Sequence, residues 1–233
     1  LADDDDTPGD DDDGQGDDDD VPLPLGCGVC AGDQVVSTAA ELLALGTCGH
    51  IEGDLLVENL DAQVTDLSPL SCLVQVDGDL FISDAVGLSS LSGLENLVAI
   101  GRSLEIHHNP ELVNLAGLSG LQSLGVSLQI YQNGQLQSLA GLAGLAVINM
   151  DLVVHNNGAL ASLAGLSNIT NVGSDLRIYD NYALLDLDGL GSIGSVGGDC
   201  YVAWNLAMTD LDGLLALSSV GADLDVARHP LIT

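Results

Sequence analysis

The chain has 233 residues, of which 46% are hydrophobic, and it carries 3 basic against 35 acidic side chains, a formal net charge of -32 at pH 7. Binding to nucleic-acid phosphates and attraction to an anionic membrane both depend on basic side chains, so this composition excludes both. The apolar residues recur every third or fourth position, and no run reaches the roughly 18 apolar residues of a membrane-spanning helix.

Residues 1–25 are predicted to form an aspartate-rich tail or linker. Three blocks of four aspartates, separated by Gly and Pro, hold 12 of the 35 acidic residues. This composition favours a disordered, self-repelling chain. One interpretation is a spacer between a lipid anchor upstream of Leu1 and a folded domain, the plan of bacterial surface lipoproteins.

Calcium binding is the alternative interpretation of the aspartates. Closely spaced carboxylates with intervening glycines suit a cation that takes six to eight oxygen ligands, although only the first half of an EF-hand loop is present. Calcium is also the one candidate cofactor of the chain. The candidate ligands lie in the tail and in one column of the repeats described below: Asp10, Asp11, Asp12, Asp13, Asp17, Asp175, Asp199 and Asp223.

Residues 26–47 are predicted to form an N-terminal cap with one short helix. Thr38 and Glu41 have the spacing of a capping box, and Gly46 is expected to end the helix.

Residues 48–233 are predicted to be a solenoid, because the same residue types return every 24 positions. Leucines form one such column: Leu67, Leu91, Leu115, Leu139, Leu163, Leu187 and Leu211. A unit of this size cannot bury its own apolar side chains, so consecutive coils must stack and share one core. Each coil also carries a pair with period 2, such as Leu104 and Ile106, which predicts a short strand in a parallel sheet with these two side chains inward.

Two polar columns flank the predicted strands. Asparagines follow the strands at Asn109, Asn133, Asn157, Asn181 and Asn205. We expect a buried ladder in which each amide bonds the backbone of the next coil. Aspartates precede the strands at Asp79, Asp151, Asp175, Asp199 and Asp223. Each is expected to accept backbone N–H groups of its own turn, or else to bind calcium.

The first coil resembles the receptor L domain of the insulin-receptor and epidermal-growth-factor-receptor ectodomains and of bacterial surface proteins. The matching residues are Cys48, Ile51, Gly53, Leu55 and Val57, followed by an L-x-x-L-x-x-V-x-G-x-L-x-I run. The resemblance covers roughly residues 27–233. It implies a mainly β, right-handed solenoid of leucine-rich-repeat type, a short helix closing the N-terminal end, and an extracellular or cell-surface location. The family's C-terminal closure is not recognisable before Thr233, so the last coil is expected to be open.

Cysteine usage fits an oxidising compartment. The resemblance implies a bridge from Cys48 to a cysteine before the first coil, and Cys27-x-x-Cys30 lacks the second pair of a zinc site. The first choice is Cys30 with Cys48 and Cys27 with Cys72, and the alternative pairs Cys48 with Cys72. Cys200 takes an inward leucine position and is expected to be a buried free thiol.

The outward strand positions gather aromatic side chains and histidines on one face of the predicted sheet. The candidate binding residues are Phe81, His107, Tyr131, His155, Arg177, Tyr179, Tyr201 and Trp204. Such rings supply rigid contact area for a ligand, or they stack across strands and stabilise the sheet; the pattern leaves both open.

Two hypotheses of function follow. The first is a non-enzymatic surface module that binds a protein or glycan on this face. The second is a structural subunit that assembles with copies of itself, with calcium between the aspartates. An enzyme is not expected, because no nucleophile with a base and no phosphate loop is recognisable, and a tyrosine coil separates His107 from His155.

Overall fold

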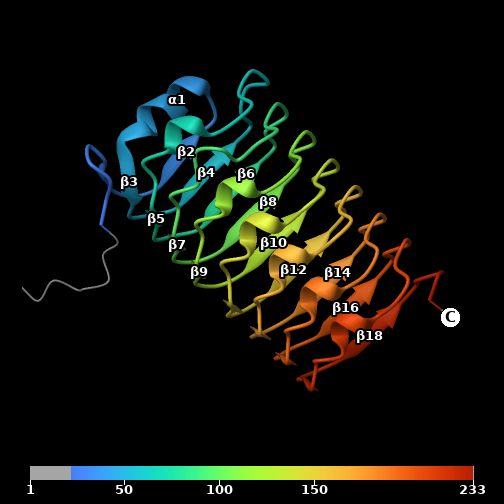
Figure 1. The fold of residues 1–233 in the computed structure, drawn as a ribbon. Helices are drawn as coiled ribbons and strands as arrows, with labels where there is room; N and C mark the ends of the chain where they lie inside the picture. The colour runs from blue at the N-terminus through green and yellow to red at the C-terminus, as the bar shows by residue number, and fades with distance from the viewer. Residues whose placement is uncertain (1–21, 233) are drawn as a thin grey trace, which may run out of the picture.

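The computed structural model describes residues 22–232. The chain winds into a stack of coils that follow one another in sequence order, from the blue end to the red end of Figure 1. Over residues 22–232 the fold is mainly β, with the parallel sheets that the repeats predict and the one short helix expected near the N-terminal end. Residues 1–21, which hold the tail's candidate calcium ligands, lie outside the described residues.

The largest sheet has nine strands, all parallel. Leu104 pairs with Leu128, and Leu128 pairs with Leu152, so equivalent residues of successive coils lie side by side. The strands are β2 (Gln34–Val36), β4 (Leu55–Glu58), β6 (Leu80–Ser83), β8 (Leu104–His107), β10 (Leu128–Tyr131), β12 (Leu152–His155), β14 (Leu176–Tyr179), β16 (Cys200–Ala203) and β18 (Leu224–Ala227).

Shorter parallel strands form a second side of the stack, divided into two sheets. The five-stranded sheet contains β1 (Gly28–Cys30), β3 (Cys48–Ile51), β5 (Gln75–Val76), β7 (Ala99–Ile100) and β9 (Ser123–Leu124). The four-stranded sheet contains β11 (Val147–Ile148), β13 (Asn171–Val172), β15 (Ser195–Val196) and β17 (Ser219–Val220). Between β9 and β11 the side chain of Asn149 donates to the carbonyl oxygen of Gly125 at 3.0 Å, which joins the two sheets.

Most coils contain a single 3₁₀ turn, which begins directly after the leucine of the predicted column. The turns are η1 (Leu45–Thr47), η2 (Ser68–Leu70), η3 (Ala116–Leu118), η4 (Ala140–Leu142), η5 (Ala164–Leu166), η6 (Asp188–Leu190) and η7 (Asp212–Leu214). A glycine occupies the middle of most of these turns, and the reason is steric: a Cβ on Gly141 would overlap the carbonyl oxygen of Leu115 in the preceding coil. The glycine therefore permits the close approach of neighbouring coils.

The core is one continuous column of apolar side chains. Leu128 and Ile130 of β10 are fully buried, as are Leu139 and Leu142 of the same coil. The pattern repeats in the neighbouring coils, so each coil covers the apolar surface of the next. Burial of a leucine or isoleucine side chain contributes about 1.5–3 kcal/mol, which explains why stacking stabilises coils that are too small to fold alone.

The N-terminal end carries the predicted helix, α1 (Ala39–Ala44). Thr38 accepts a hydrogen bond from the Glu41 backbone, and the Glu41 carboxylate accepts from the Thr38 backbone, so the capping box is present. The α-helix ends just before Gly46, as expected, with Leu45 as its C-cap, but Gly46 does not adopt a left-handed conformation. The chain tightens from α1 directly into η1, and Gly46 lies inside that turn rather than in a left-handed cap after it.

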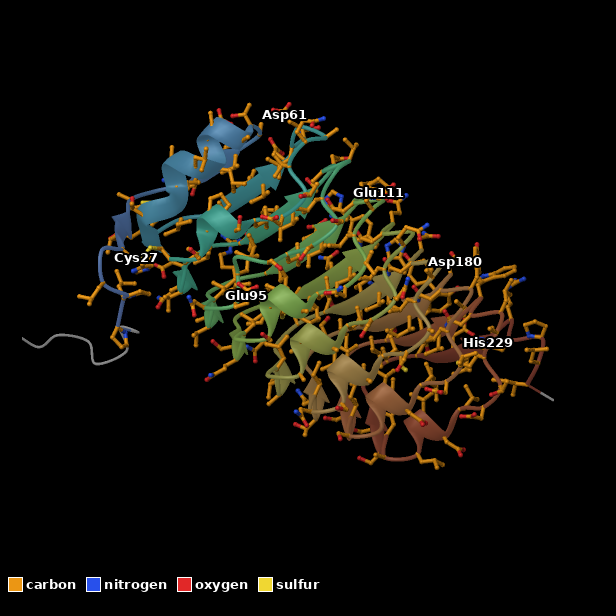
Figure 2. The ribbon with its side chains drawn as sticks, turned by 45° about the horizontal axis from the view of Figure 1, so that its top comes forward. Cys27, Asp61, Glu95, Glu111, Asp180 and His229 are labelled. Atoms are coloured by element: carbon orange, nitrogen blue, oxygen red, sulfur yellow. A yellow bond between two sulfur atoms is a disulfide. The ribbon has the colours of Figure 1, made fainter. Side chains whose placement is uncertain are left out.

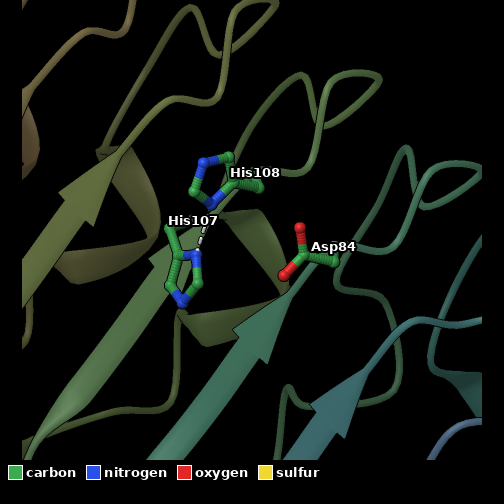
Figure 3. A group of neighbouring side chains, drawn as sticks. All are labelled: Asp84, His107 and His108. Carbon is green, nitrogen blue, oxygen red and sulfur yellow. Dashed lines mark hydrogen bonds between the residues drawn. The ribbon is translucent and has the colours of Figure 1, made fainter.

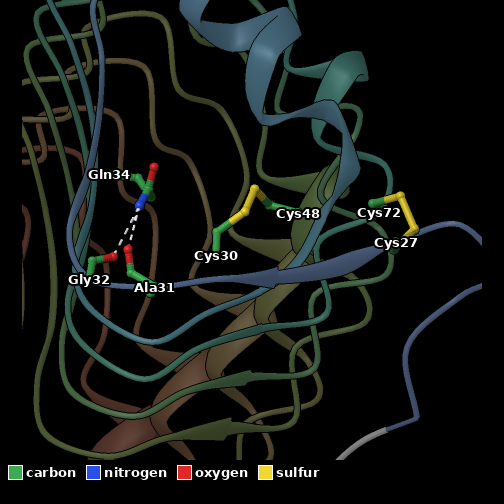
Figure 4. The surroundings of a disulfide bond; sticks show 7 residues. All are labelled: Cys27, Cys30, Ala31, Gly32, Gln34, Cys48 and Cys72. Carbon is green, nitrogen blue, oxygen red and sulfur yellow. Dashed lines mark hydrogen bonds between the residues drawn. A yellow bond between two sulfur atoms is a disulfide. The ribbon is translucent and has the colours of Figure 1, made fainter.

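Two disulfides fasten this end of the solenoid (Figure 4). Cys30 is bonded to Cys48, and Cys27 is bonded to Cys72, each with 5.7 Å between the Cα atoms. This is the first of the two arrangements considered from the sequence. Both bonds join the segment before α1 to the first complete coil, so they restrict the unfolded chain where the stack has a neighbour on one side only.

The asparagines of the column form a fully buried ladder. Asn133 Oδ1 accepts from the Asn109 backbone at 3.1 Å, and Asn133 Nδ2 donates to the Ile106 carbonyl at 2.9 Å. These partners belong to the preceding coil, not to the following coil as expected. The repeat alone cannot decide the direction, because both neighbouring coils present the same backbone groups.

The aspartates before the strands form a second ladder. Asp151 Oδ1 accepts the N–H of Asp175 at 3.1 Å, and Asp175 Oδ1 accepts the N–H of Asp199 at 2.7 Å. The expectation that each carboxylate bonds its own turn was therefore wrong: the donor lies in the next coil, because stacking brings the next N–H of the column within reach. Where the column has serine, the hydroxyl of Ser127 accepts from the Asp151 backbone instead.

Candidate functional site

The outward face of the nine-stranded sheet carries two rows of side chains, as the period-2 pattern predicts. In the first row Glu105 pairs with Gln129, and Arg177 pairs with Tyr201. In the second row His107 pairs with Tyr131, and His155 pairs with Tyr179. The sheet therefore brings together residues that the sequence separates by whole coils.

Four rings of the second row form a continuous stack. His107 lies flat on Tyr131 with ring centroids 4.7 Å apart, and Tyr131 lies on His155 at 4.9 Å. His155 in turn lies on Tyr179 at 4.5 Å, and Tyr201 meets Tyr179 edge-on at 5.7 Å. Cross-strand stacking, one of the two interpretations of the pattern, is thus present. The four stacked rings are also partly exposed, so they form a solvent-facing aromatic surface, which we call the ring stack.

Polar contacts hold one end of the ring stack. The Tyr131 hydroxyl donates to Glu105 Oε1, and His107 Nε2 lies 3.5 Å from the same oxygen. Desolvation raises the pKa of Tyr131 and lowers that of His107, in the first case with the added effect of the Glu105 hydrogen bond. Both rings are therefore neutral near pH 7, and this end of the stack carries the charge of Glu105.

A hollow of about 440 Å³ lies at the other end of the ring stack. Its lining residues combine aromatic rings, carboxylates and one guanidinium: Arg177, Tyr179, Asp199, Cys200, Tyr201, Asp223 and Asp225. Arg177 Nη2 lies 2.6 Å from Asp175 Oδ2, so its charge is paired within the chain. The hollow is consequently acidic, with two tyrosines at its side. Cys200 is a buried free thiol, as expected, and burial raises its pKa to about 11.

A third row, at the ends of the strands, was not recognised as a separate feature in the sequence. The residue that follows each strand of the nine-stranded sheet from β4 to β18 adopts a left-handed backbone, with φ between 51° and 64°. The row consists of Asn59, Asp84, His108, Gln132, Asn156, Asp180, Trp204 and Arg228. Its signal was available, since five of these residues, His108, Gln132, Asn156, Asp180 and Trp204, directly precede the asparagine column. In Figure 2, Asp180 and His229, which follow β14 and β18, lie along this edge.

Bulky residues in this third row are unusual, because a left-handed backbone favours Gly, Asn and Asp. Trp204 has a φ of 59° and is 39% exposed. The Arg228 guanidinium lies over its ring, 4.5 Å from the centroid. Trp204 thus belongs to the strand ends rather than to the ring stack. Phe81 also lies apart, on β6, two strands from Tyr131.

Residues 22–232 contain one tight group of three potential metal ligands, Asp84, His107 and His108 (Figure 3). The predicted calcium ligands Asp175, Asp199 and Asp223 lie one coil apart in the aspartate ladder. Calcium at these three residues stays a prediction.

A model of the receptor L domain family matches residues 47–165. The chain belongs to the receptor L domain family. The match runs from β3 to η5, and beyond it β14, β16 and β18 continue the same parallel sheet. Comparison with curated proteins and with solved structures gives no match.

Receptor L domains are non-enzymatic modules that bind ligands, in general proteins, so the family suggests a ligand-binding, receptor-type module here. The family and the two disulfides fit an extracellular protein. Among the helices of residues 22–232, none combines the length and the apolar character needed to cross a bilayer.

Proposed function

We propose that this receptor L domain is an extracellular or cell-surface recognition module, and that its strand face binds a protein with exposed Lys or Arg side chains. The observation that carries the proposal is the acidic hollow beside the ring stack. Tyr179 and Tyr201 line the hollow with their aromatic rings, while Asp199, Asp223 and Asp225 offer carboxylates. Cationic side chains bind to both kinds of group, through cation–π contact and ion pairing.

The charge balance supports a cationic partner. The chain has 3 basic side chains in total, and each already has an internal partner. Arg102 lies 3.4 Å from Asp79, Arg177 lies 2.6 Å from Asp175, and Arg228 covers Trp204. The net charge of -32 would accelerate association with a basic partner and repel an acidic one.

A peptide-display library and a glycan array, applied to the purified chain, test this assignment. We expect the enriched peptides to contain clustered Lys or Arg residues and to bind less tightly as salt is added. Asp225→Asn and Tyr201→Ala should weaken this binding, because both residues line the hollow. Asp61→Asn is the matched control: it removes the same charge from an exposed position that does not line the hollow.

Two outcomes would refute the proposal. One is equal weakening by Asp61→Asn and Asp225→Asn, which would mean that binding follows net charge alone. The other is binding of neutral glycans without any binding of basic peptides, which would assign the face to carbohydrate. Attachment to a surface through residues 1–25 is a separate proposal, supported by the composition of that segment.

A further inference from the structure

Asp84, His107 and His108 come from two neighbouring coils and meet where their strands end. Asp84 follows β6, while His107 is the last residue of β8 and His108 follows it. One ligand atom of each residue lies within 4.8 Å of those of the other two (Figure 3). The Nδ1 atoms of His107 and His108 are 2.7 Å apart and share a hydrogen bond, in which one ring donates and the other accepts.

The backbone holds these side chains in place. Asp84 and His108 are equivalent residues of the third row, with φ values of 52° and 54°. The next residues are tied together, because the Ala85 N–H donates to Asn109 Oδ1 at 3.1 Å in the buried ladder. All eight residues of the third row share this left-handed backbone, so the stacked coils fix the conformation in which Asp84 and His108 converge.

The ring orientations turn Nδ1 of His107 toward His108, and a metal ion would replace the proton that the two Nδ1 atoms share. His107 is parallel to Tyr131, within 1°, and His108 meets His107 at 78°. His107 Nε2 faces Glu105 Oε1 at 3.5 Å, and the Tyr131 hydroxyl holds that same carboxylate. A histidine that binds a metal through one nitrogen usually donates its other N–H to a carboxylate, which fixes the tautomer. Glu105 lies where such a carboxylate would be, 3.5 Å from Nε2 of His107, while Nδ1 of His107 faces His108.

We propose that Asp84, His107 and His108 form a site for a divalent transition-metal ion, such as Zn²⁺. Two imidazole nitrogens and one carboxylate oxygen match the ligand preferences of Zn²⁺, whereas Ca²⁺ prefers oxygen ligands only. The site has three protein ligands, two of them exposed, so further coordination positions remain open to water.

The neighbouring coils suggest matched substitutions that preserve the backbone. Gln132 occupies the position of His108 in the next coil, and Asn59 and Asn156 occupy the position of Asp84 in other coils. His108→Gln and Asp84→Asn therefore place a residue type that the chain already uses in this left-handed position. Asp180→Asn is the control for the carboxylate, since Asp180 belongs to the same row. His50→Gln, on β3 of another sheet, is the control for the imidazole.

The test is calorimetric titration of Zn²⁺ into the full chain, purified without a polyhistidine tag, in excess Ca²⁺ to occupy weak sites on the aspartates. We expect one Zn²⁺ site per chain, weakened by more than about tenfold in His108→Gln and in Asp84→Asn and unchanged in both controls. Co²⁺ in place of Zn²⁺ should give visible absorption bands that the two site variants lose. Melting temperatures near that of the wild-type chain would show that the variants are folded.

The proposal fails if the wild-type chain binds no Zn²⁺ under these conditions. It also fails if His108→Gln and Asp84→Asn bind Zn²⁺ as tightly as the wild-type chain, or if the control variants lose the same affinity. None of these outcomes depends on the identity of a protein ligand, so the metal site and the proposed recognition function are tested separately.

Discussion

The imidazole of His155 lies flat on the phenol ring of Tyr179, with centroids 4.5 Å apart and 5° between the ring planes. Tyr131 covers the other side of the same imidazole at 4.9 Å. The ring is thus enclosed by two aromatic faces, and Asn156 Nδ2 contacts its Nδ1 at 2.9 Å. Because this environment exists only when the sheet is folded, the pKa of His155 differs between the folded and the unfolded chain.

The ring stack should make stability depend on pH through His155. Desolvation lowers its folded pKa below the ordinary value of 6.5, although Asp180 acts in the opposite direction. As pH falls through 6.5, the unfolded chain binds the proton before the folded chain does. The free energy of unfolding therefore declines between pH 6.5 and the folded pKa, and this group has no effect on it above pH 6.5. When pH is lowered from about 7.5 to about 5.5, the melting temperature of the wild-type chain should fall by more than that of His155→Gln. Parallel declines would contradict this.

The asparagine ladder should contribute strongly to stability. Asn133→Ala leaves the Asn109 N–H and the Ile106 carbonyl without these side-chain partners in a buried environment. At about 1–3 kcal/mol for each of these two groups, the free energy of unfolding should fall by about 2–6 kcal/mol. Urea unfolding measures this change. Gln135→Ala, two residues away and exposed, serves as the control and should change stability by less than about 0.5 kcal/mol.

The sequence was sufficient to predict which residues share a face. Leu128 and Ile130 point inward, and Gln129 and Tyr131 point outward, because a strand alternates its side chains and every coil repeats the alternation. The sequence could not predict whether a ladder side chain bonds the preceding or the following coil, since the coils before and after Asn133 offer identical backbone groups. The convergence of Asp84 with His108 was visible as a shared column, but their backbone conformation depends on the turn that Asn109 closes.

Close approach of the coils at the 3₁₀ turns should make the central glycine intolerant of a side chain. A methyl group on Gly141 would overlap the Leu115 carbonyl oxygen, so the coils must separate or the turn must shift. Gly141→Ala should therefore lower the free energy of unfolding by about 1–3 kcal/mol, the usual cost of overpacking. Gly134→Ala is the matched control, because a Cβ there meets nothing within 4 Å. Equal stability of the two variants would argue against the steric explanation.

Calcium binding at the aspartate ladder leads to a further prediction. Asp199 Oδ1 accepts the backbone N–H of Asp223, which leaves Asp199 Oδ2 to face a cation, whereas Asp175 Oδ2 is already paired with Arg177. If Ca²⁺ binds there, it should raise the melting temperature more than Mg²⁺ at equal concentration, and Asp199→Asn should reduce the difference. Sedimentation with Ca²⁺ and with a chelator tests assembly in the same samples. A monomer under both conditions would exclude calcium-dependent self-assembly.

Repulsion among the aspartates of η6 and η7 should destabilise the folded chain at low salt. Asp186 raises the pKa of Asp188, with smaller effects from desolvation and from Asp210 and Asp212. For an acid whose folded pKa is raised, the native state binds the proton more tightly, so stability increases as pH falls through that pKa. Asp188→Asn should accordingly raise the melting temperature near pH 7 in low salt. The gain should shrink toward zero at about 0.5 M NaCl, where the screening length is only a few ångströms. A gain that persists at high salt would point to a cause other than charge repulsion, such as better helical propensity of the amide.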